Sequence, residues 1–194
     1  MYNIDEIKEK LIKDIGEKRY KHSLRVAEFS EELANIYGVD SDKAYLAGLI
    51  HDCAKHNEER YVEQLEIDIS SYKISSIKDP VLHSFLGAEV AKKVYNISDK
   101  DILNAIKYHT TGKESMTKLE KIIFIADAIE PNRDFEGIDK IRKLAETNLD
   151  KAMLALLDSN IIFLISKKAS INPLSFEARN YLIEVKNEKT RHNS

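Results

Sequence analysis

The sequence predicts an all-α fold in a single domain. Apolar residues recur at spacings of three and four along most of the chain, which is the period of one face of an amphipathic helix. The 194 residues include only six glycines and three prolines, a composition that favours helices over strands and turns. A chain of this length can bury one sizeable core, whereas two independent domains would be a tight fit. We therefore expect one domain over residues 1–188, followed by a polar tail over 189–194.

The expected helices of the first half begin and end at recognisable residues. Gly16 separates a helix over 3–15 from one over 17–37, and a second glycine, Gly38, follows. Asp40 can cap the next helix, which continues through His51 and Asp52. The remaining segments are a short helix over 58–65, a loop or frayed turns over 66–79, a helix over 82–94 after Pro80, and a helix that begins at 99 or 100 and reaches His109.

The second half of the chain is equally helical in its pattern. Thr117 and Glu120 have the spacing of a capping box, and they introduce an almost wholly apolar helix that ends at Pro131. Further helices are expected over 138–147, 150–167 and about 176–185. From Lys186 onward the chain is polar, and we expect it to be frayed.

Composition limits the classes of function. The formal net charge of −3 gives no field that would attract bulk nucleic acid or an acidic membrane. A single cysteine, Cys53, excludes an internal disulfide and fits a reducing compartment; in its apolar setting we expect a small buried side chain. The N-terminal residues lack a signal-peptide layout, and the apolar stretch 152–165 is too short and too polar to span a bilayer. We expect a cytoplasmic protein.

Four polar residues interrupt the apolar pattern. His22 extends the inward stripe of its helix, His51 and Asp52 follow the apolar segment 44–50, and Asp127 stands inside the most apolar helix of the chain. Burying an ionised carboxylate is costly unless a cation or hydrogen-bond donors compensate. These four residues are therefore best explained together.

Two imidazoles and two carboxylates from three helices predict a metal site. Nitrogen and oxygen ligands without thiolates favour octahedral divalent metals such as iron, manganese or magnesium. An alternative is that the histidines are hydrogen-bonded core and that Arg133 or a lysine pairs with Asp127. Lys55, three residues beyond Asp52, is expected on the same helical face, where it could meet an anion held by the metal.

The order His22, then His51 and Asp52, then Asp127 resembles the four-ligand signature of HD-domain metal-dependent phosphohydrolases. Within that superfamily the chain is similar to the YqeK type over nearly its whole length. This type consists of symmetrical bis(5'-nucleosyl)-tetraphosphatases, which split diadenosine tetraphosphate into two ADP. The segments that carry this resemblance are Arg19 to His22, His51 to Lys55, His83, His109 to Gly112, Ile125 to Arg133, and Arg179 with Asn180.

The resemblance implies an HD-domain helical bundle and assigns a divalent metal to His22, His51, Asp52 and Asp127. Iron is the metal it implies first, with manganese, cobalt or magnesium as alternatives. His83 and His109 would either contact phosphate directly or hold a second ion. Asp52 would orient the attacking water, and Lys55 and Arg133 would stabilise negative charge in the transition state.

The resemblance also implies a small-molecule partner, a dinucleoside polyphosphate with an ADP- or GDP-like product, and a homodimer. The residues implied to contact nucleotide phosphates are Arg19, Lys55, His83, His109, Thr110, Asp127 and Arg133. Those implied to border the nucleoside are Ile171, Asn172, Pro173, Leu174, Ser175 and Phe176, of which Leu174 and Ser175 look less typical of the family.

Two other functions fit the same residues. One is an HD-type enzyme acting on another nucleotide, either a nucleotidase or a cyclic-nucleotide phosphodiesterase. The other is a nonenzymatic nucleotide-binding module. The products formed from diadenosine tetraphosphate separate these readings, because only symmetrical cleavage gives ADP alone.

Overall fold

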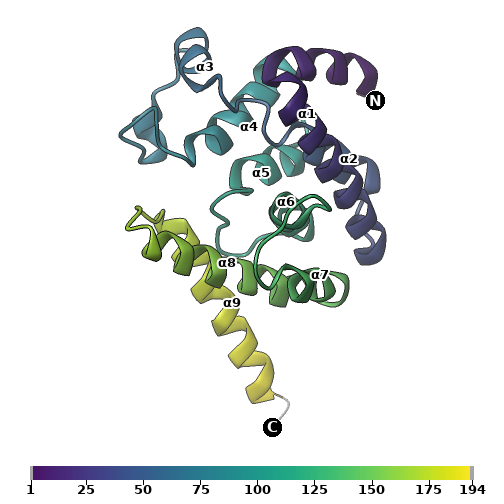
Figure 1. Ribbon diagram of the computed structural model, residues 1–194, viewed down its shortest axis with the longest axis vertical. Coiled ribbons are helices and arrows are strands. Elements are labelled where there is room, and N and C mark those ends of the chain that lie inside the picture. The colour runs from purple at the N-terminus through teal and green to yellow at the C-terminus, as the bar shows by residue number, and fades with distance from the viewer. Residues whose placement is uncertain (1, 193–194) are drawn as a thin grey trace.

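The computed structural model describes residues 2–192, except the side chains at 186 and 188–192, and the described chain contains helices and no strands (Figure 1). The all-α prediction and the single domain are therefore confirmed. The elements are α1 (Ile4–Tyr37), α2 (Ser41–Ile50), α3 (Glu58–Gln64), the 3-10 helix η1 (Ile69–Tyr72), α4 (Leu82–Val94), α5 (Lys100–Tyr108), α6 (Lys118–Ile129), α7 (Ile138–Thr147), α8 (Leu149–Ser166) and α9 (Pro173–His192). Over the described residues, no helix combines the length and apolarity that a membrane crossing requires.

Helix α1 is kinked at the residue where the sequence predicts a break. Gly16 has φ 76° and ψ 160°, a conformation that a residue with a side chain rarely adopts. The helix ends at Gly38, which is left-handed and donates its backbone N–H to the carbonyl of Ala34. The kink lets the long second part of α1 run along α2, while the first part lies at an angle to it at the top of the view (Figure 1).

The close approach of α1 and α2 depends on Gly48. A Cβ atom at this position would lie 2.9 Å from the Cα atom of Ala27 and 3.0 Å from the carbonyl oxygen of Val26. The small residue that the sequence places one turn before His51 therefore allows backbone-to-backbone contact between the two helices. This contact fixes the distance between the helices that carry His22 and His51.

Helix α6 forms the centre of the bundle, because α1, α2, α5, α7 and α8 all pack against it. A helix that is apolar on every side is expected to be buried, and most of α6 is. Its N-terminus has the predicted capping box: the Thr117 hydroxyl accepts from the Glu120 N–H, and the Glu120 carboxylate accepts from the Thr117 N–H. Asp127 is thereby carried into the middle of the fold.

Two expectations about helix boundaries are wrong. Helix α2 ends at Ile50, and 51–56 form turns in which Cys53 and Lys55 donate their N–H groups to carbonyls three residues earlier. Lys55 therefore does not share a helical face with Asp52. At the other end of the chain, α9 runs to His192 rather than stopping near Val185, since no glycine or proline follows Pro173 to end it. The division at residue 188 remains a prediction.

Candidate metal centre and active site

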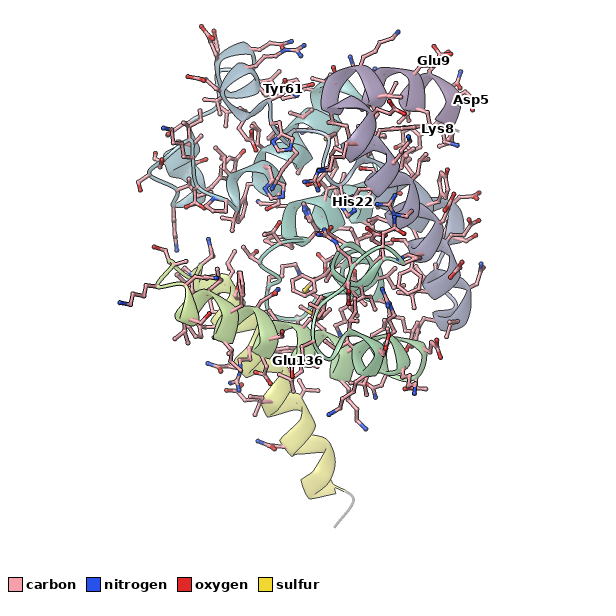
Figure 2. All side chains as sticks on the ribbon, in the orientation of Figure 1. Asp5, Lys8, Glu9, His22, Tyr61 and Glu136 are labelled. Carbon is pink, nitrogen blue, oxygen red and sulfur yellow. The ribbon has the colours of Figure 1, made fainter. Side chains whose placement is uncertain are left out.

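The four predicted ligands converge from three places in the fold. His22 lies on α1, where Figure 2 shows it facing the middle of the bundle, His51 and Asp52 follow α2, and Asp127 lies on α6. Nε2 of His22 lies 2.9 Å from Oδ1 of Asp127. Nε2 of His51 lies 3.3 Å from Oδ2 of Asp52 and 3.6 Å from Oδ1 of Asp127. Ligand atoms of His22, His51 and Asp127 are close enough together to hold one metal ion.

The two further histidines of the resemblance lie on the other side of Asp52. Nε2 of His83 is 3.3 Å and Nε2 of His109 is 3.7 Å from Oδ1 of this carboxylate. The two Nε2 atoms are 3.2 Å apart, and Thr110 Oγ1 lies 3.3 Å from that of His83. His51, Asp52 and His109 form a second group that could hold an ion. The geometry is therefore compatible with both roles predicted for His83 and His109, direct phosphate contact or binding of a second ion.

All four imidazoles use Nδ1 for a hydrogen bond and turn Nε2 toward the carboxylates. The Nδ1 atoms of His51, His83 and His109 each lie 2.7 Å from a backbone carbonyl, and that of His22 lies 3.2 Å from Oε1 of Glu130. These carbonyl and carboxylate oxygens are acceptors, so Nδ1 donates to them and Nε2 is the nitrogen left to bind a proton or a metal ion. This is how metal-binding histidines are commonly held.

The electrostatics of the cluster favour a cation at its centre. Burial alone would lower the pKa of His51, but Asp52 and Asp127 outweigh it and raise that pKa to about 10. Burial opposes ionisation of the two carboxyls, yet the neighbouring histidines hold the pKa of each well below its usual range. Burial, with His109 beside it, lowers the pKa of His83 to about 3, so this ring is neutral.

The donor set fits a divalent metal. Nε2 of His51 is fully buried and lacks a hydrogen-bond partner. The Nε2 atoms of His83 and His109 lie 3.2 Å apart, and Nζ of Lys55 lies 3.3 Å from that of His83, so a positive charge already lies beside this pair. Imidazole nitrogen with carboxylate oxygen is a suitable ligand set for iron, manganese or zinc.

The alternative cations are also present. Arg133 donates from Nη2 to Oδ1 of Asp127 at 2.9 Å and from Nε to its backbone carbonyl at 3.0 Å. Arg19 donates from Nη1 to Oδ2 of Asp52 at 2.9 Å. The predicted pairing of Arg133 with Asp127 therefore occurs. These guanidinium groups balance carboxylate charge but leave Nε2 of His51 without a partner, which a metal would supply.

Sequence reasoning missed the partner that orients His22. The carboxylate of Glu130 is buried, and it accepts from Nε and Nη2 of Arg25 at 2.7 and 3.2 Å and from the backbone N–H of Asn132 at 2.8 Å. Burial opposes its ionisation, but Arg25 and the other donors lower the pKa of Glu130 to about 2. The sequence did contain an indication that Glu130 lies near the cluster, because it follows Asp127 by three residues, about one helical turn.

Lys55 reaches the site although it lies on a turn rather than on α2. Its Nζ atom is 2.9 Å from Nδ1 of His83, and burial lowers the pKa of its ammonium group. Cys53, two residues earlier, is fully buried, and burial raises the pKa of its thiol. The prediction that this cysteine is a packed core residue is confirmed.

The segment predicted to border the nucleoside lies beside the loop that follows α5. The hydroxyl of Ser175 donates to the backbone carbonyl of Thr111 at 3.0 Å, so the start of α9 is tied to the neighbour of Thr110. Leu174 packs on the core, whereas the side chain of Phe176 is 41% exposed. Ile171, Asn172 and Pro173 complete this segment, and a nucleoside contact for its residues remains a prediction.

A cleft of about 530 Å³ opens beside the cluster, and we call it the basic cleft. Six of its lining residues belong to the arrangement described above: Arg19, His22, Arg25, Glu130, Asn132 and Arg133. The others are Ile15, Lys18 and His56. His56, whose side chain is exposed, comes from the turns that follow Asp52.

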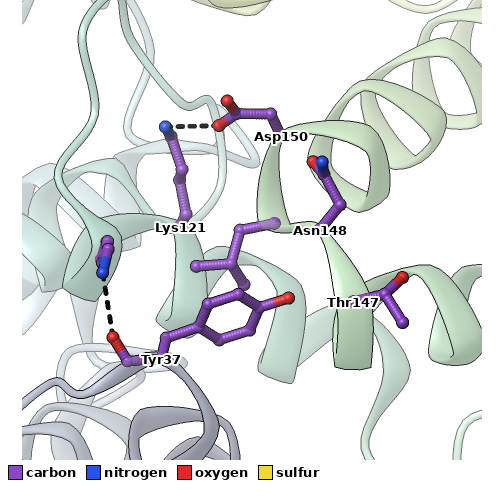
Figure 3. A pocket seen from close by; sticks show the side chains of 7 residues that line it. Tyr37, Lys121, Thr147, Asn148 and Asp150 are labelled. Atoms are coloured by element: carbon purple, nitrogen blue, oxygen red, sulfur yellow. Dashed lines mark hydrogen bonds and ion pairs between the residues drawn. The ribbon is translucent and has the colours of Figure 1, made fainter.

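A smaller pocket of about 260 Å³ lies away from the cluster, where the end of α1 meets α6 and the start of α8 (Figure 3). Two of its charged groups are paired, Lys121 with Asp150 at 2.6 Å, and Lys118 donates to the carbonyl of Tyr37 at 2.9 Å. None of the predicted site residues lines this pocket. Of these two openings, the basic cleft is the one lined by predicted site residues.

Comparison with known proteins agrees with the geometry. The HD domain model matches residues 19–132, a range that includes all four predicted ligands. The chain is 40% identical to the symmetrical bis(5'-nucleosyl)-tetraphosphatase of Staphylococcus aureus, over 92% of this chain and 94% of the relative. It is 39% identical to the protein of the same name from Bacillus subtilis, over 87% of this chain and 91% of the relative.

A solved structure shares the fold. The crystal structure of a predicted HD superfamily hydrolase involved in NAD metabolism, from Clostridium acetobutylicum, superposes with a TM-score of 0.83 at 44% identity. The match covers 95% of this chain and 98% of that one. The chain therefore belongs to the HD-domain family, in the group that contains these two tetraphosphatases.

Proposed function

We propose that this chain is a metal-dependent hydrolase that cleaves diadenosine tetraphosphate, and related dinucleoside tetraphosphates, symmetrically into two ADP. The observation that carries the proposal is the convergence of four imidazole Nε2 atoms on Asp52 and Asp127 at the edge of a cleft lined by arginine and lysine. The names of the relatives from Staphylococcus aureus and Bacillus subtilis supply the substrate. Their similarity extends over most of each chain, including the metal cluster.

His22, His51, Asp52 and Asp127 would hold the metal, and we propose iron, with manganese, cobalt or magnesium as alternatives. When bound, a divalent metal lowers the pKa of water and neutralises charge on phosphoryl oxygens. The mixed nitrogen and oxygen donor set supports such an ion. Glu130 supports it further, because its bond to Nδ1 keeps the lone pair of His22 directed toward Asp127.

The reaction consumes one water. Its oxygen forms a bond to one of the two central phosphorus atoms, the bridging P–O bond breaks, and the bridge oxygen leaves with the other ADP. Asp52 would accept a hydrogen bond from the attacking water and so direct its lone pair at phosphorus. Lys55 and Arg133 would stabilise the charge that develops on the phosphoryl and bridging oxygens.

The remaining polar residues would position the substrate. Arg19, His83, His109 and Thr110 would contact phosphate oxygens, with a second ion near His83 and His109 as the alternative to direct contact. Asp127 would border the same phosphates while it holds the metal. The segment 171–176 would border one nucleoside, which fits the bond between Ser175 and the loop after α5.

The experiment that tests the proposal is turnover of diadenosine tetraphosphate by anaerobically prepared protein loaded with iron, with nucleotide products separated by chromatography. We expect ADP as the sole product, and no product from Asp127→Ala. Release of phosphate from mononucleotides without symmetrical cleavage would instead identify a nucleotidase. Binding without turnover would identify a nonenzymatic binding module.

Three further expectations remain predictions. They are a cytoplasmic location, a homodimer and the absence of nucleic-acid binding. Sedimentation of the metal-loaded chain would test the dimer, and a titration with duplex and single-stranded DNA would test the last.

A further inference from the structure

The two oxygens of Asp52 face two different sets of residues. Oδ2 lies 2.9 Å from Nη1 of Arg19 and 3.3 Å from Nε2 of His51, whereas Oδ1 faces the rings of His83 and His109 at 3.3 and 3.7 Å. Arg19 belongs to the basic cleft, and neither His83 nor His109 is among the residues that line it. The carboxylate of Asp52 thus lies between Arg19 of the basic cleft and a second group made up of His83, His109 and Lys55.

We propose that the basic cleft binds the nucleoside diphosphate that leaves, as a subsite separate from the one beside His83, His109 and Thr110; this assignment rests on the proposed function. Lys18, Arg25, His56 and Asn132 flank the departing diphosphate. These four residues had no role in the predicted site. The other half of the substrate, which receives the water oxygen, occupies the side of His83 and Thr110.

The chemistry of symmetrical cleavage requires such a subsite. The scissile bond joins the second and third phosphates, so each half of the substrate carries a full diphosphate and a nucleoside. In an in-line displacement the leaving oxygen lies opposite the attacking water, while the retained half extends from an equatorial oxygen of the attacked phosphorus, so the two halves extend in different directions. One set of phosphate-binding residues can hold only one of them.

The charge of the basic cleft matches a departing diphosphate. Its lining includes Lys18, Arg19, Arg25 and Arg133, against the single carboxylate of Glu130, whose own charge is engaged by Arg25. The Lys18 side chain is exposed, and the structure shows no ion pair for it among the described residues. A volume of about 530 Å³ lies in the range of roughly 300–1,000 Å³ that is usual for small-molecule sites.

The backbone supports the same assignment at the rim. His56 has φ 66°, in the left-handed region that histidine enters more readily than most residues, and this conformation ends the turns after Asp52 with the ring at the cleft. The backbone N–H of Asn132 is bonded to Glu130, while its exposed side chain remains at the opening. Both side chains can therefore meet a ligand without any change in the buried cluster.

Binding of an uncleavable substrate analogue tests the assignment. The probe is diadenosine tetraphosphate with a methylene group in place of the central bridging oxygen, titrated by calorimetry into the full metal-loaded chain. We expect Lys18→Glu and Asn132→Asp each to weaken its binding about tenfold or more, since each adds a negative charge beside a phosphate.

Lys21→Glu is the matched control. Lys21 lies on α1 next to His22, its side chain is 63% exposed and pairs with Glu17, and it does not line the cleft. Lys21→Glu changes the charge by the same amount as Lys18→Glu, and the two positions are three residues apart on α1. We expect less than about a twofold effect on the analogue.

The outcomes separate the two proposals. If the unmodified chain hydrolyses the natural substrate but Lys18→Glu binds the analogue as tightly as Lys21→Glu does, the leaving-group subsite is wrong and the proposed function stands. If the unmodified chain neither binds the analogue nor hydrolyses the substrate, both proposals fail.

Discussion

Glu130 offers the sharpest test of the candidate metal centre, because it orients the predicted ligand His22 and is not itself a predicted ligand. Glu130→Gln keeps the shape of the side chain but removes the charge that accepts from Nδ1 of His22 and from Arg25. The new amide group would have to present N–H donors to residues that are themselves donors. We expect His22 to lose its fixed orientation and metal affinity to fall about 10- to 100-fold, the usual cost of removing the partner of a metal-bound histidine.

The loss of metal affinity can be measured by competition with a chelator, and also as a change in the thermal stabilisation that the metal gives. At a metal concentration about 1,000 times the dissociation constant, binding stabilises the unmodified chain by about 4 kcal/mol, and a 100-fold weaker variant by only about 1.4 kcal/mol. For a chain of this size each kcal/mol shifts Tm by roughly 2–4 °C. Metal should therefore raise Tm by about 8–16 °C in the unmodified chain, by about 5–11 °C in a variant weakened tenfold and by about 3–6 °C in one weakened 100-fold.

Glu120→Gln is the control for this experiment. Glu120 is also a buried glutamate of the α6 region, but its carboxylate caps the N-terminus of the helix with Thr117 and pairs with Lys113. Glutamine can serve in a capping box, so this variant should keep its metal affinity while losing some stability without metal. Equal metal affinity in Glu130→Gln and the unmodified chain, or equal losses in both variants, would refute the reasoning.

The other predictions concern stability and accessibility. Gly48→Ala adds a Cβ about half an ångström closer to backbone atoms than ordinary contact allows, so thermal unfolding should show a Tm lower by roughly 2–8 °C. Gly87→Ala is the control and should lower Tm less, because its nearest contact is a side-chain atom at 3.2 Å. A rise in Tm would show that the helices separate freely. Asp99→Ala removes the cap of α5 and the partner of Lys43, and should cost about 1 kcal/mol in denaturant unfolding. The pKa of Asp99 is lowered in the fold, so this contribution is present above about pH 4, its ordinary value being 3.8, and shrinks as pH falls; a difference that grew in acid would contradict it. The thiol of Cys53 should not react with a thiol reagent in the native protein and should react fully after unfolding; rapid native labelling would show that the site opens.

The helix starts were predictable because their causes are local. Asp40, Asp99 and Thr117 each cap the helix that follows through bonds to backbone N–H groups two or three residues away. Such bonds need no information from the rest of the chain. The end of α2 was not predictable in the same way, since 51–56 contain no glycine or proline and the turns there form around buried His51 and Asp52.

The convergence of the four candidate ligands was predictable because polar residues on apolar helical faces are best explained as one buried cluster. Their partners were not. Glu130 precedes a proline at the end of a helix, where an exposed glutamate would be ordinary, and its bonds to His22 and Arg25 join residues 108 and 105 positions away along the chain. Only the packing of α1 against α6 reveals that this carboxylate is buried. The grouping of Lys18, His56 and Asn132 in one cleft has the same origin, since they come from three separate segments.

The hydrogen bonds of the imidazole rings have a consequence for how the site is assembled. His51, His83 and His109 each donate Nδ1–H to the carbonyl three residues before them, so a segment of four residues suffices to choose the tautomer and the ring direction. His22 alone depends on a distant residue, Glu130. Three rings can therefore be set by their own turns of chain, while the fourth is set only when α1 docks on the end of α6. The time at which a refolding chain reaches full metal affinity should therefore report when α1 packs against the end of α6.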